Sequence, residues 1–171
     1  MPATITNPRD LYLTLLADIL FVERTLSHEV LPKLLGQVEN PGLAGPLAQH
    51  LQETKRHVIV VQDAFRAVGA QPSSNHSLPF VGLKDQAAEL SSSAVAPPLA
   101  DLVHLTAAIH TEHYEIAAYR ALLELRELVG ADERAAGLAT NLKQEQAALS
   151  NLERIGPELV QAARGYSASA A

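Results

Sequence analysis

No glycine or proline occurs between Leu99 and Val129, and this uninterrupted stretch constrains the fold more than any other feature of the sequence. Alanine and leucine, which are strong helix formers, account for 28 and 27 of the 171 residues. Apolar residues in the stretch recur at spacings of three and four, and no segment of the chain shows the sustained alternation of a strand. The sequence therefore predicts an all-α protein with at least one very long helix.

Proline and glycine divide the rest of the chain into further helices. Asn7 and Pro8 form a helix start, with asparagine as the cap and proline in the first turn. We predict helices from Arg9 to Leu35 with a kink or early end at Pro32, from Pro46 to Val68, from Val81 to Leu90, from Leu99 to Val129, and from a cap at Asp132 to Ile155. Pro157 is expected to begin a short last helix.

The lengths of the connections indicate how these helices pair. A short connection joins the first two long helices, and Gly130 with Ala131 forms a very short one between the last two. The link between the two pairs, 69–98, is long and carries its own short helix. This pattern predicts a four-helix bundle of two antiparallel hairpins with a long crossover. We expect a single domain over 1–171, with its core at about 7–156 and a short helix and frayed tail over 157–171.

Composition and charge exclude several classes of protein. The chain has no cysteine, which rules out disulfide frameworks, thiolate nucleophiles and cysteine-ligated metals. Its net charge of −6 argues against a general nucleic-acid binder, and no apolar run has the length of a membrane span. The first residues lack the basic end and apolar stretch of a signal peptide. We therefore expect a cytoplasmic protein with neither nucleic acid nor membrane as a partner.

One glutamate interrupts the apolar seam of each of three long helices near its middle, namely Glu23, Glu112 and Glu145. On the other long helix, Glu53 lies one turn before His57, so both side chains can project from the same face. The separations across the two hairpins place Glu23 level with Glu53, and Glu112 level with Glu145. Four acidic residues are thus expected at matched depth in the bundle.

A bound metal explains this arrangement better than the ordinary alternatives. Taken singly, such a glutamate is usually a solvated surface residue, and a histidine such as His57 is usually a hydrogen-bonded core residue. Burial of an isolated carboxylate is unfavourable unless a cation or proton compensates, however, and no Lys or Arg lies in the middle of these seams. Bundles of this kind build di-iron or di-manganese sites from glutamate and histidine. Glu115 is a rival or additional ligand beside Glu112. No role is assigned to His28, His50 and His76, and His104 and His110 are expected on a flank or at a subunit contact.

The stretch Glu112-His113-Tyr114-Glu115-Ile116-Ala117-Ala118-Tyr119 resembles the signature of the YciE/YciF-like family of ferritin-like, rubrerythrin-like bacterial stress proteins. Shorter pieces match in the same order, namely Asp10-Leu11-Tyr12, Val22-Glu23-Arg24, Leu31-Pro32-Lys33 and Glu53-Thr54-Lys55-Arg56-His57-Val58, so the resemblance spans roughly residues 7–155. It implies a rubrerythrin-like bundle, often a homodimer, with a centre of one or two iron or manganese ions and a link to stress responses. The ligands that it implies are Glu23, Glu53, His57, Glu112 and Glu145.

One position departs from the pattern of this family. The family's fourth helix typically has an acidic residue four positions after its glutamate, where this chain has Leu149. The helix then offers Glu145 alone, so the second metal position is short of a ligand or empty. Two main functions remain open on these grounds, with an iron-storage cage of the mini-ferritin kind as a third and weaker option. One is a metal-binding ferritin-like protein with oxygen, peroxide or ferroxidase-like chemistry, and the other is a non-catalytic structural or interaction bundle with a decayed metal site.

Overall fold

The structure is a computed structural model that describes residues 4–94, 96–131 and 133–169. Its elements in chain order are α1 (Pro8–Thr25), the π-helical turn η1 (Leu26–Val30), α2 (Leu31–Leu35), α3 (Pro41–Ala67), α4 (Leu78–Ser93), α5 (Pro97–Leu128), the 3-10 turn η2 (Glu133–Ala136) and α6 (Gly137–Ser169). The described residues contain no strand, which confirms the all-α prediction.

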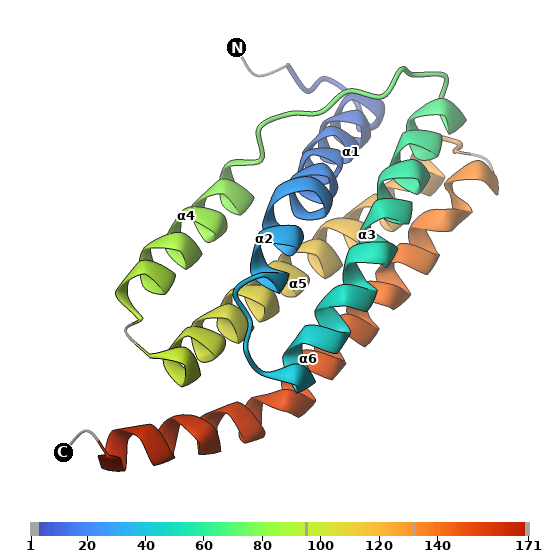
Figure 1. The fold of residues 1–171 in the computed structure, drawn as a ribbon. Helices are drawn as coiled ribbons and strands as arrows, with labels where there is room; N and C mark the ends of the chain where they lie inside the picture. The colour runs from blue at the N-terminus through green and yellow to red at the C-terminus, as the bar shows by residue number, and fades with distance from the viewer. Residues whose placement is uncertain (1–3, 95, 132, 170–171) are drawn as a thin grey trace.

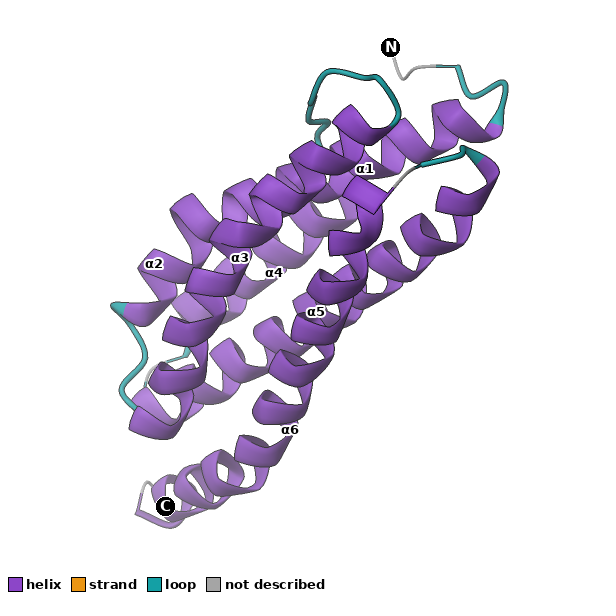
Figure 2. Cartoon of the chain, turned by 90° about the vertical axis from the view of Figure 1, so that its right-hand side faces the viewer, coloured by secondary structure: helices purple, strands orange, loops and turns teal. Residues whose placement is uncertain are grey.

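Four rods form the bundle, and they are built from α1 with its continuation η1–α2, from α3, from α5 and from α6 (Figure 1). The first two rods and the last two form antiparallel hairpins, and α4 lies in the long crossover between them (Figures 1 and 2). In this crossover α4 packs against α5 on the outside of the bundle. The ferritin-like architecture expected from the sequence is therefore confirmed.

The first rod changes its helical geometry just after Glu23. Asn7 caps α1 as predicted, because its side-chain oxygen accepts a hydrogen bond from the backbone N–H of Asp10 at 2.9 Å. Further on, the N–H of Leu31 bonds to the carbonyl of Leu26, five residues back, which is the spacing of a π-helix. The predicted kink at Pro32 therefore takes the form of a π-helical turn directly before it. This turn relieves the clash between the proline ring and the preceding turn of the helix.

Helix α3 begins at Pro41, so the predicted start at Pro46 is wrong by more than one turn. Asn40 is the cap, and its side-chain oxygen accepts hydrogen bonds from Gly42 N at 2.8 Å and Leu43 N at 3.3 Å. The pair Asn40-Pro41 thus repeats the start signal seen at the beginning of α1. Pro46 lies inside the helix near its N-terminal end, where a missing N–H removes only one bond of the ladder.

The remaining boundaries differ from the predictions mostly by small extensions. Helix α4 is longer than the predicted 81–90, and α5 includes both prolines at its N-terminal end. The ends of α3 and α5 are marked by Gly69 and Gly130, whose φ angles of 69° and 62° lie in the left-handed region that favours glycine. The predicted cap at Asp132 lies outside the described residues.

The C-terminal segment is helical, as expected. It is the end of α6, however, and not a separate helix that begins at Pro157. Helix α6 includes Pro157 and runs to Ser169, so most of the predicted frayed tail is helix, and residues 170–171 lie outside the described part. The dark red end of α6 turns away from the axis of the bundle (Figure 1). A proline inside a helix explains such a bend, because it lacks the N–H that the ladder needs.

The apolar core fills both ends of the bundle and leaves a polar layer between them. Its largest fully buried side chains include Tyr12, Phe65, Phe80 and Tyr119. At the start of α6, Gly137 brings the chain so close to α3 that an added Cβ would lie 2.8 Å from a methyl group of Val60. Within the described ranges, none of the helices combines the length and apolar character needed to cross a lipid bilayer.

Candidate metal centre

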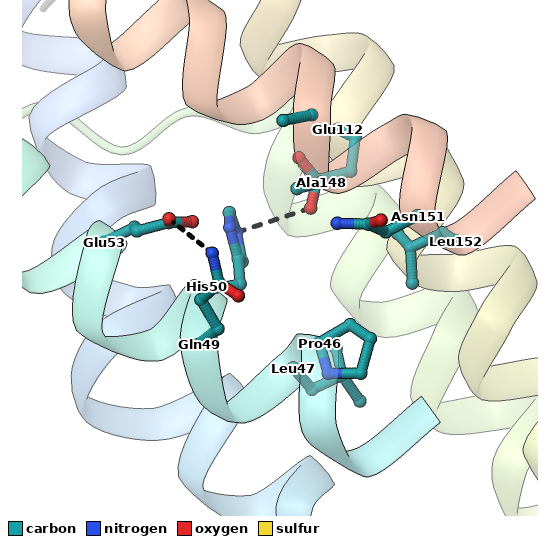
Figure 3. Close-up of a pocket in the computed structure, with 10 residues that line it drawn as sticks. Pro46, Leu47, Gln49, His50, Glu53, Glu112, Ala148, Asn151 and Leu152 are labelled. Atoms are coloured by element: carbon teal, nitrogen blue, oxygen red, sulfur yellow. Dashed lines mark hydrogen bonds and ion pairs between the residues drawn. The ribbon is translucent and has the colours of Figure 1, made fainter. Parts of the chain in front are cut away.

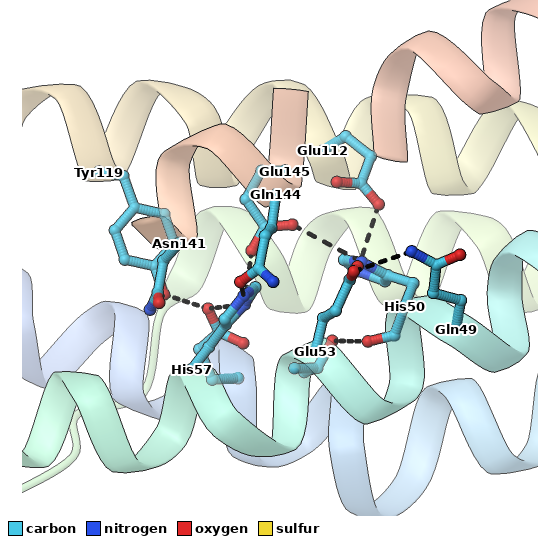
Figure 4. A network of polar contacts seen from close by, with 11 residues as sticks. Gln49, His50, Glu53, His57, Glu112, Tyr119, Asn141, Gln144 and Glu145 are labelled. Atoms are coloured by element: carbon cyan, nitrogen blue, oxygen red, sulfur yellow. Dashed lines mark hydrogen bonds and ion pairs between the residues drawn. The ribbon is translucent and has the colours of Figure 1, made fainter. Parts of the chain in front are cut away.

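The polar layer at the middle of the bundle contains four buried glutamates from three helices. Glu23 comes from α1, Glu112 and Glu115 from α5, and Glu145 from α6, and none of them is more than 3 % exposed. Two histidines of α3, His50 and His57, complete the layer and are also buried. Figure 4 shows most of these side chains converging from α3, α5 and α6 on the bundle interior.

These six side chains form two groups that share one member. The first group is His50, Glu112, Glu115 and Glu145, and the second is Glu23, His57 and Glu145. In each group every residue offers a nitrogen or oxygen atom that lies within 4.8 Å of the others. Glu145 belongs to both groups, so its two carboxylate oxygens can serve two adjacent metal positions.

In the first group His50 lies between the two acidic helices. Its Nε2 is 3.3 Å from Glu112 Oε1, and its Nδ1 is 3.7 Å from Glu145 Oε2. Neither carboxylate oxygen of Glu115 has a hydrogen-bond partner among the described residues, although Glu115 is completely buried. Buried carboxylate oxygens without partners are rare in proteins, and a coordinated cation is one of the few groups that satisfies them.

In the second group His57 is held with its Nδ1 toward the acids. This atom lies 2.8 Å from Glu145 Oε1 and 3.4 Å from Glu23 Oε1. On the other side of the ring, Nε2 lies 2.9 Å from the side-chain oxygen of Gln144. Because an amide oxygen only accepts hydrogen bonds, Nε2 carries a proton, and Nδ1 is the nitrogen that would bind a metal once its own proton has left.

A second layer of hydrogen bonds orients Glu23. The hydroxyl of Tyr119 donates a short hydrogen bond to Glu23 Oε1, and Asn141 Nδ2 donates to the Tyr119 oxygen at 2.9 Å. Both Tyr119 and Asn141 are buried. The remaining oxygen of Glu23, Oε2, has no partner among the described residues and is left for a ligand. Outer hydrogen bonds of this kind fix the direction in which a metal ligand points.

The metal-free cluster is electrostatically unfavourable. Burial, reinforced by the negative charge of Glu145, raises the pKa of Glu112 and of Glu115 well above the ordinary carboxyl value. Burial likewise raises the pKa of Glu23 to about 7, although His57 opposes this rise. Burial alone would lower the pKa of His57, but the adjacent carboxylates of Glu145 and Glu23 raise it to about 11. The protein thus places acids where they are costly to ionise without a cation.

The donor set fits a pair of divalent cations. Four ionised carboxylates carry four negative charges, which two divalent cations neutralise, and the described chain places no Lys or Arg against the cluster. Among the described residues, Glu23 Oε2, Glu112 Oε2 and both oxygens of Glu115 have neither a hydrogen-bond partner nor an ion pair, and Nδ1 of each histidine faces only carboxylates. Hard carboxylate oxygens with one nitrogen at each position suit iron or manganese.

The pKa directions predict how the stability of the metal-free protein depends on pH. Acids whose pKa is raised on folding, such as Glu23, stabilise the fold fully below about pH 4.5 and lose this contribution as pH rises through about 7. His57 loses its contribution between pH 6.5 and about 11. Because the pKa of His50 is lowered on folding, its contribution to stability decreases as pH falls, and this effect is confined to pH values below 6.5.

The free energy of unfolding of the metal-free protein is therefore expected to fall between pH 6.5 and 9. The slope is about 1.4 kcal/mol per pH unit for each proton that the folded state holds and the unfolded state releases. Urea denaturation with chelator at several pH values measures this slope. With Mn²⁺ present the slope is expected to reverse, because the metal competes with protons for the same ligands. A rise in stability over this range without metal would contradict the electrostatic account.

A small opening leads from the surface to the first group (Figure 3). Its cavity volume is about 20 Å³, and its lining includes Gln49, His50, Glu53, Glu112 and Asn151. Glu53 is half-buried at this opening, where its Oε1 accepts a hydrogen bond from Gln49 Nε2 at 2.9 Å. An opening of this size admits a water molecule or a small ion.

The structure brings together most of the residues that the sequence singled out. Glu23, His57, Glu112 and Glu145 lie in the two groups, and Glu115 lies there beside Glu112 as an additional member. Glu53 belongs to neither group, because its side chain lies at the small opening; its role as a ligand stays a prediction. Leu149 is half-buried and contributes no ligand.

Sequence reasoning missed His50. It lies seven residues before His57, which is two helical turns, and therefore on the same face of α3. This spacing of seven residues was the signal that could have identified His50 as a candidate ligand. Its position three residues before Glu53 strengthened that signal. With His50 the described cluster contains six candidate ligands even though α6 supplies only Glu145.

Comparisons with known proteins identify the family and the fold. Residues 7–164 match the family model described as a domain of unknown function, DUF892. The chain is 28 % identical over 139 residues to the protein YciF of Escherichia coli K12, covering 81 % of this chain and 83 % of YciF. Its structure is similar to that of YcfI from Rhodopseudomonas palustris, with 31 % identity, a TM-score of 0.84 and coverage of 90 % and 97 % of the two chains. It is also similar to the crystal structure of the E. coli stress protein YciF, with 26 % identity, a TM-score of 0.85 and coverage of 92 % and 99 %.

Proposed function

This chain belongs to the DUF892 family, and from that starting point we propose that it binds two divalent ions, iron or manganese, inside its helical bundle. The observation that carries the proposal is the convergence of buried ligand atoms in two groups joined by Glu145, with four carboxylate oxygens, from Glu23, Glu112 and Glu115, that have neither a hydrogen-bond partner nor an ion pair among the described residues. Burial of so many carboxylate oxygens without partners is unfavourable unless cations occupy the space between them. A stress-related role is part of the proposal, because the similar E. coli protein is described as a stress protein.

Each residue of the cluster has a defined task in this proposal. Glu112, Glu115 and His50 would hold one ion, Glu23 and His57 would hold the other, and Glu145 would be available to both. Gln144 holds the tautomer of His57, and Tyr119 orients Glu23. Glu53 at the small opening receives incoming ions. Two iron or manganese ions held by these residues would supply redox chemistry toward a small oxidant such as oxygen or peroxide.

Loading metal into the protein tests the proposal directly. We expect about two ions of Mn²⁺ or Fe²⁺ per chain to remain after anaerobic loading and dialysis, measured by elemental analysis. Crystals of the loaded protein are expected to show two peaks of anomalous scattering beside Glu145. A chain that retains no metal under these conditions would refute the proposal.

The same experiment separates this function from a purely structural role. The similar protein YcfI is described as a candidate structural protein, and Leu149 replaces an acidic residue here. A structural bundle with a decayed site predicts that chelation leaves the thermal midpoint unchanged. It also predicts that the double substitution Glu53→Ala with His57→Ala lowers stability by the same amount with and without chelator, because His57 is fully buried, and that it leaves the oligomeric state unchanged. A large loss of thermal stability on chelation would instead support the metal centre.

A further inference from the structure

A second and larger cleft lies between the crossover helix and the bundle. Helix α4 forms one wall of this α4 cleft, and η1, α2, α3 and α5 form the others. Its volume is about 540 Å³, within the range of pockets that hold small organic molecules. Half of its lining residues are apolar, including Leu34, Phe80, Leu83, Ala107 and Ala108. Nothing in the metal chemistry described above requires a space of this size or character.

The α4 cleft ends on polar groups at two places along α5. One end is formed by His50 and Glu112 of the first metal-ligand group, and the other by His104 with Ser91 of α4. His104 and Glu112 are eight residues apart, or about 12 Å along the helix axis, which is the length of an unbranched chain of about eight carbons. Between them Ala107 and Ala108 leave room, because their side chains are small.

His104 is a buried polar group with an unused atom. Only 7 % of the residue is exposed, its Nε2 lies 3.2 Å from Ser91 Oγ, and its Nδ1 has no partner among the described residues. Burial lowers the pKa of His104, so the ring is neutral near pH 7. Asp101 lies one turn earlier on α5, is also buried and acts electrostatically on His104, so an anionic group placed at His104 would meet repulsion. An uncharged hydroxyl can hydrogen-bond to His104 and Ser91 without this cost.

We propose that the α4 cleft binds one medium-chain primary alcohol, with its hydroxyl on His104 and its chain running past Ala107 toward His50 and Glu112. The hydroxyl of such a molecule forms a hydrogen bond with His104 Nδ1, and its chain fills the space between the apolar walls. The far end of its chain then lies beside the first metal position. That last point rests on the proposed metal-binding function, whereas binding in the cleft does not.

Calorimetric titration of the metal-free protein with a series of primary alcohols tests the proposal. We expect affinity to rise about fourfold for each added CH₂ from 1-butanol to 1-octanol and to level off beyond it. Octanoate at pH 7.5 is expected to bind at least about tenfold more weakly than 1-octanol, because the negative charge of Asp101 acts at His104 and would repel a carboxylate there. Absence of binding by 1-octanol, or tighter binding by octanoate, would overturn the proposal.

Paired substitutions locate the site. Ala107→Phe is expected to abolish binding of 1-octanol, whereas Ala117→Phe, at an exposed position of the same helix outside the cleft, leaves it unchanged. On α4, Ala87→Phe is expected to block the cleft, and its exposed neighbour Gln86→Phe is the control. If Ala107→Phe does not fold, the comparison of Ala87→Phe with Gln86→Phe decides whether 1-octanol binds in the cleft. Equal binding by the members of each folded pair would contradict this location.

His104→Leu tests the assignment of the hydroxyl. We expect it to weaken binding of 1-octanol about three- to tenfold, the usual effect of losing one hydrogen bond. Unchanged affinity would overturn the assignment of this end of the cleft.

If the unsubstituted protein binds 1-octanol but retains no metal, the proposed function alone is refuted. If it retains metal but does not bind 1-octanol, this inference alone is refuted. In protein that does bind Mn²⁺, paramagnetic broadening is expected to be stronger for the methyl protons of bound 1-octanol than for those next to its hydroxyl. The opposite order would overturn the proposed orientation.

Discussion

Glu145→Gln is expected to abolish tight binding of both metal ions at once. Glu145 is the member that the two ligand groups share, and the substitution replaces its charge with a neutral amide of the same shape. Two bound ions at about 100 times their dissociation constants stabilise a protein by roughly 5 kcal/mol. For a chain of this size the thermal midpoint in the presence of Mn²⁺ should therefore fall by about 10 °C or more.

Glu153→Gln provides the matched control, because Glu153 is exposed on the same helix and belongs to neither group. Both variants have the same change in net charge, so a general effect of charge on metal affinity would appear in both. Elemental analysis and thermal unfolding with and without Mn²⁺ measure the two effects. Retention of two ions by Glu145→Gln would show that the groups do not share this ligand.

Glu115→Gln is expected to have opposite effects on the metal-free and the metal-loaded protein. Glu115 is fully buried, neither of its oxygens has a partner among the described residues, and burial raises its pKa. Without metal at pH 8, the neutral amide removes the cost of ionising or protonating this group. We expect the free energy of unfolding to increase by about 2 kcal/mol and the thermal midpoint by roughly 5 °C.

With metal the same substitution removes a charged ligand from the first position. Affinity for one of the two ions is expected to fall about 100-fold, because the neutral amide no longer attracts the cation as the carboxylate does. Glu124→Gln, at an exposed position of α5, is expected to change neither stability nor affinity. If Glu115→Gln destabilised the metal-free protein and left metal binding intact, Glu115 would have a structural role instead.

The sequence predicted the bundle well because helix punctuation is a local property. The start at Asn7-Pro8 and the ends at Gly69 and Gly130 depend on backbone conformations that single residues favour or forbid. The error at Pro46 has the same origin, since Asn40-Pro41 supplied an earlier and better-capped start for α3. The continuation of α6 through Pro157 was not predictable locally, because packing in the structure outweighs the loss of one backbone hydrogen bond.

The candidate site was predictable in part for a related reason. A charged residue in an apolar seam is visible in the sequence, and Glu23, Glu112 and Glu145 are all buried in the structure. The side chain that α3 contributes beside His57 was harder to choose. Glu53 and His50 both lie within two turns of His57, and the rotation of α3 turns His50 inward and Glu53 toward the small opening.

The sequence by itself determined that this protein is a helical bundle with acids at the centre of its seams, because helical periodicity and the cost of burying charge act within each helix. Only the tertiary structure decided which of these side chains meet. The rotation of each helix about its own axis is set by packing against its three neighbours, so no single helix specifies it. That rotation joins Glu145 to both ligand groups, brings His50 into the first of them, and leaves the α4 cleft open beside them.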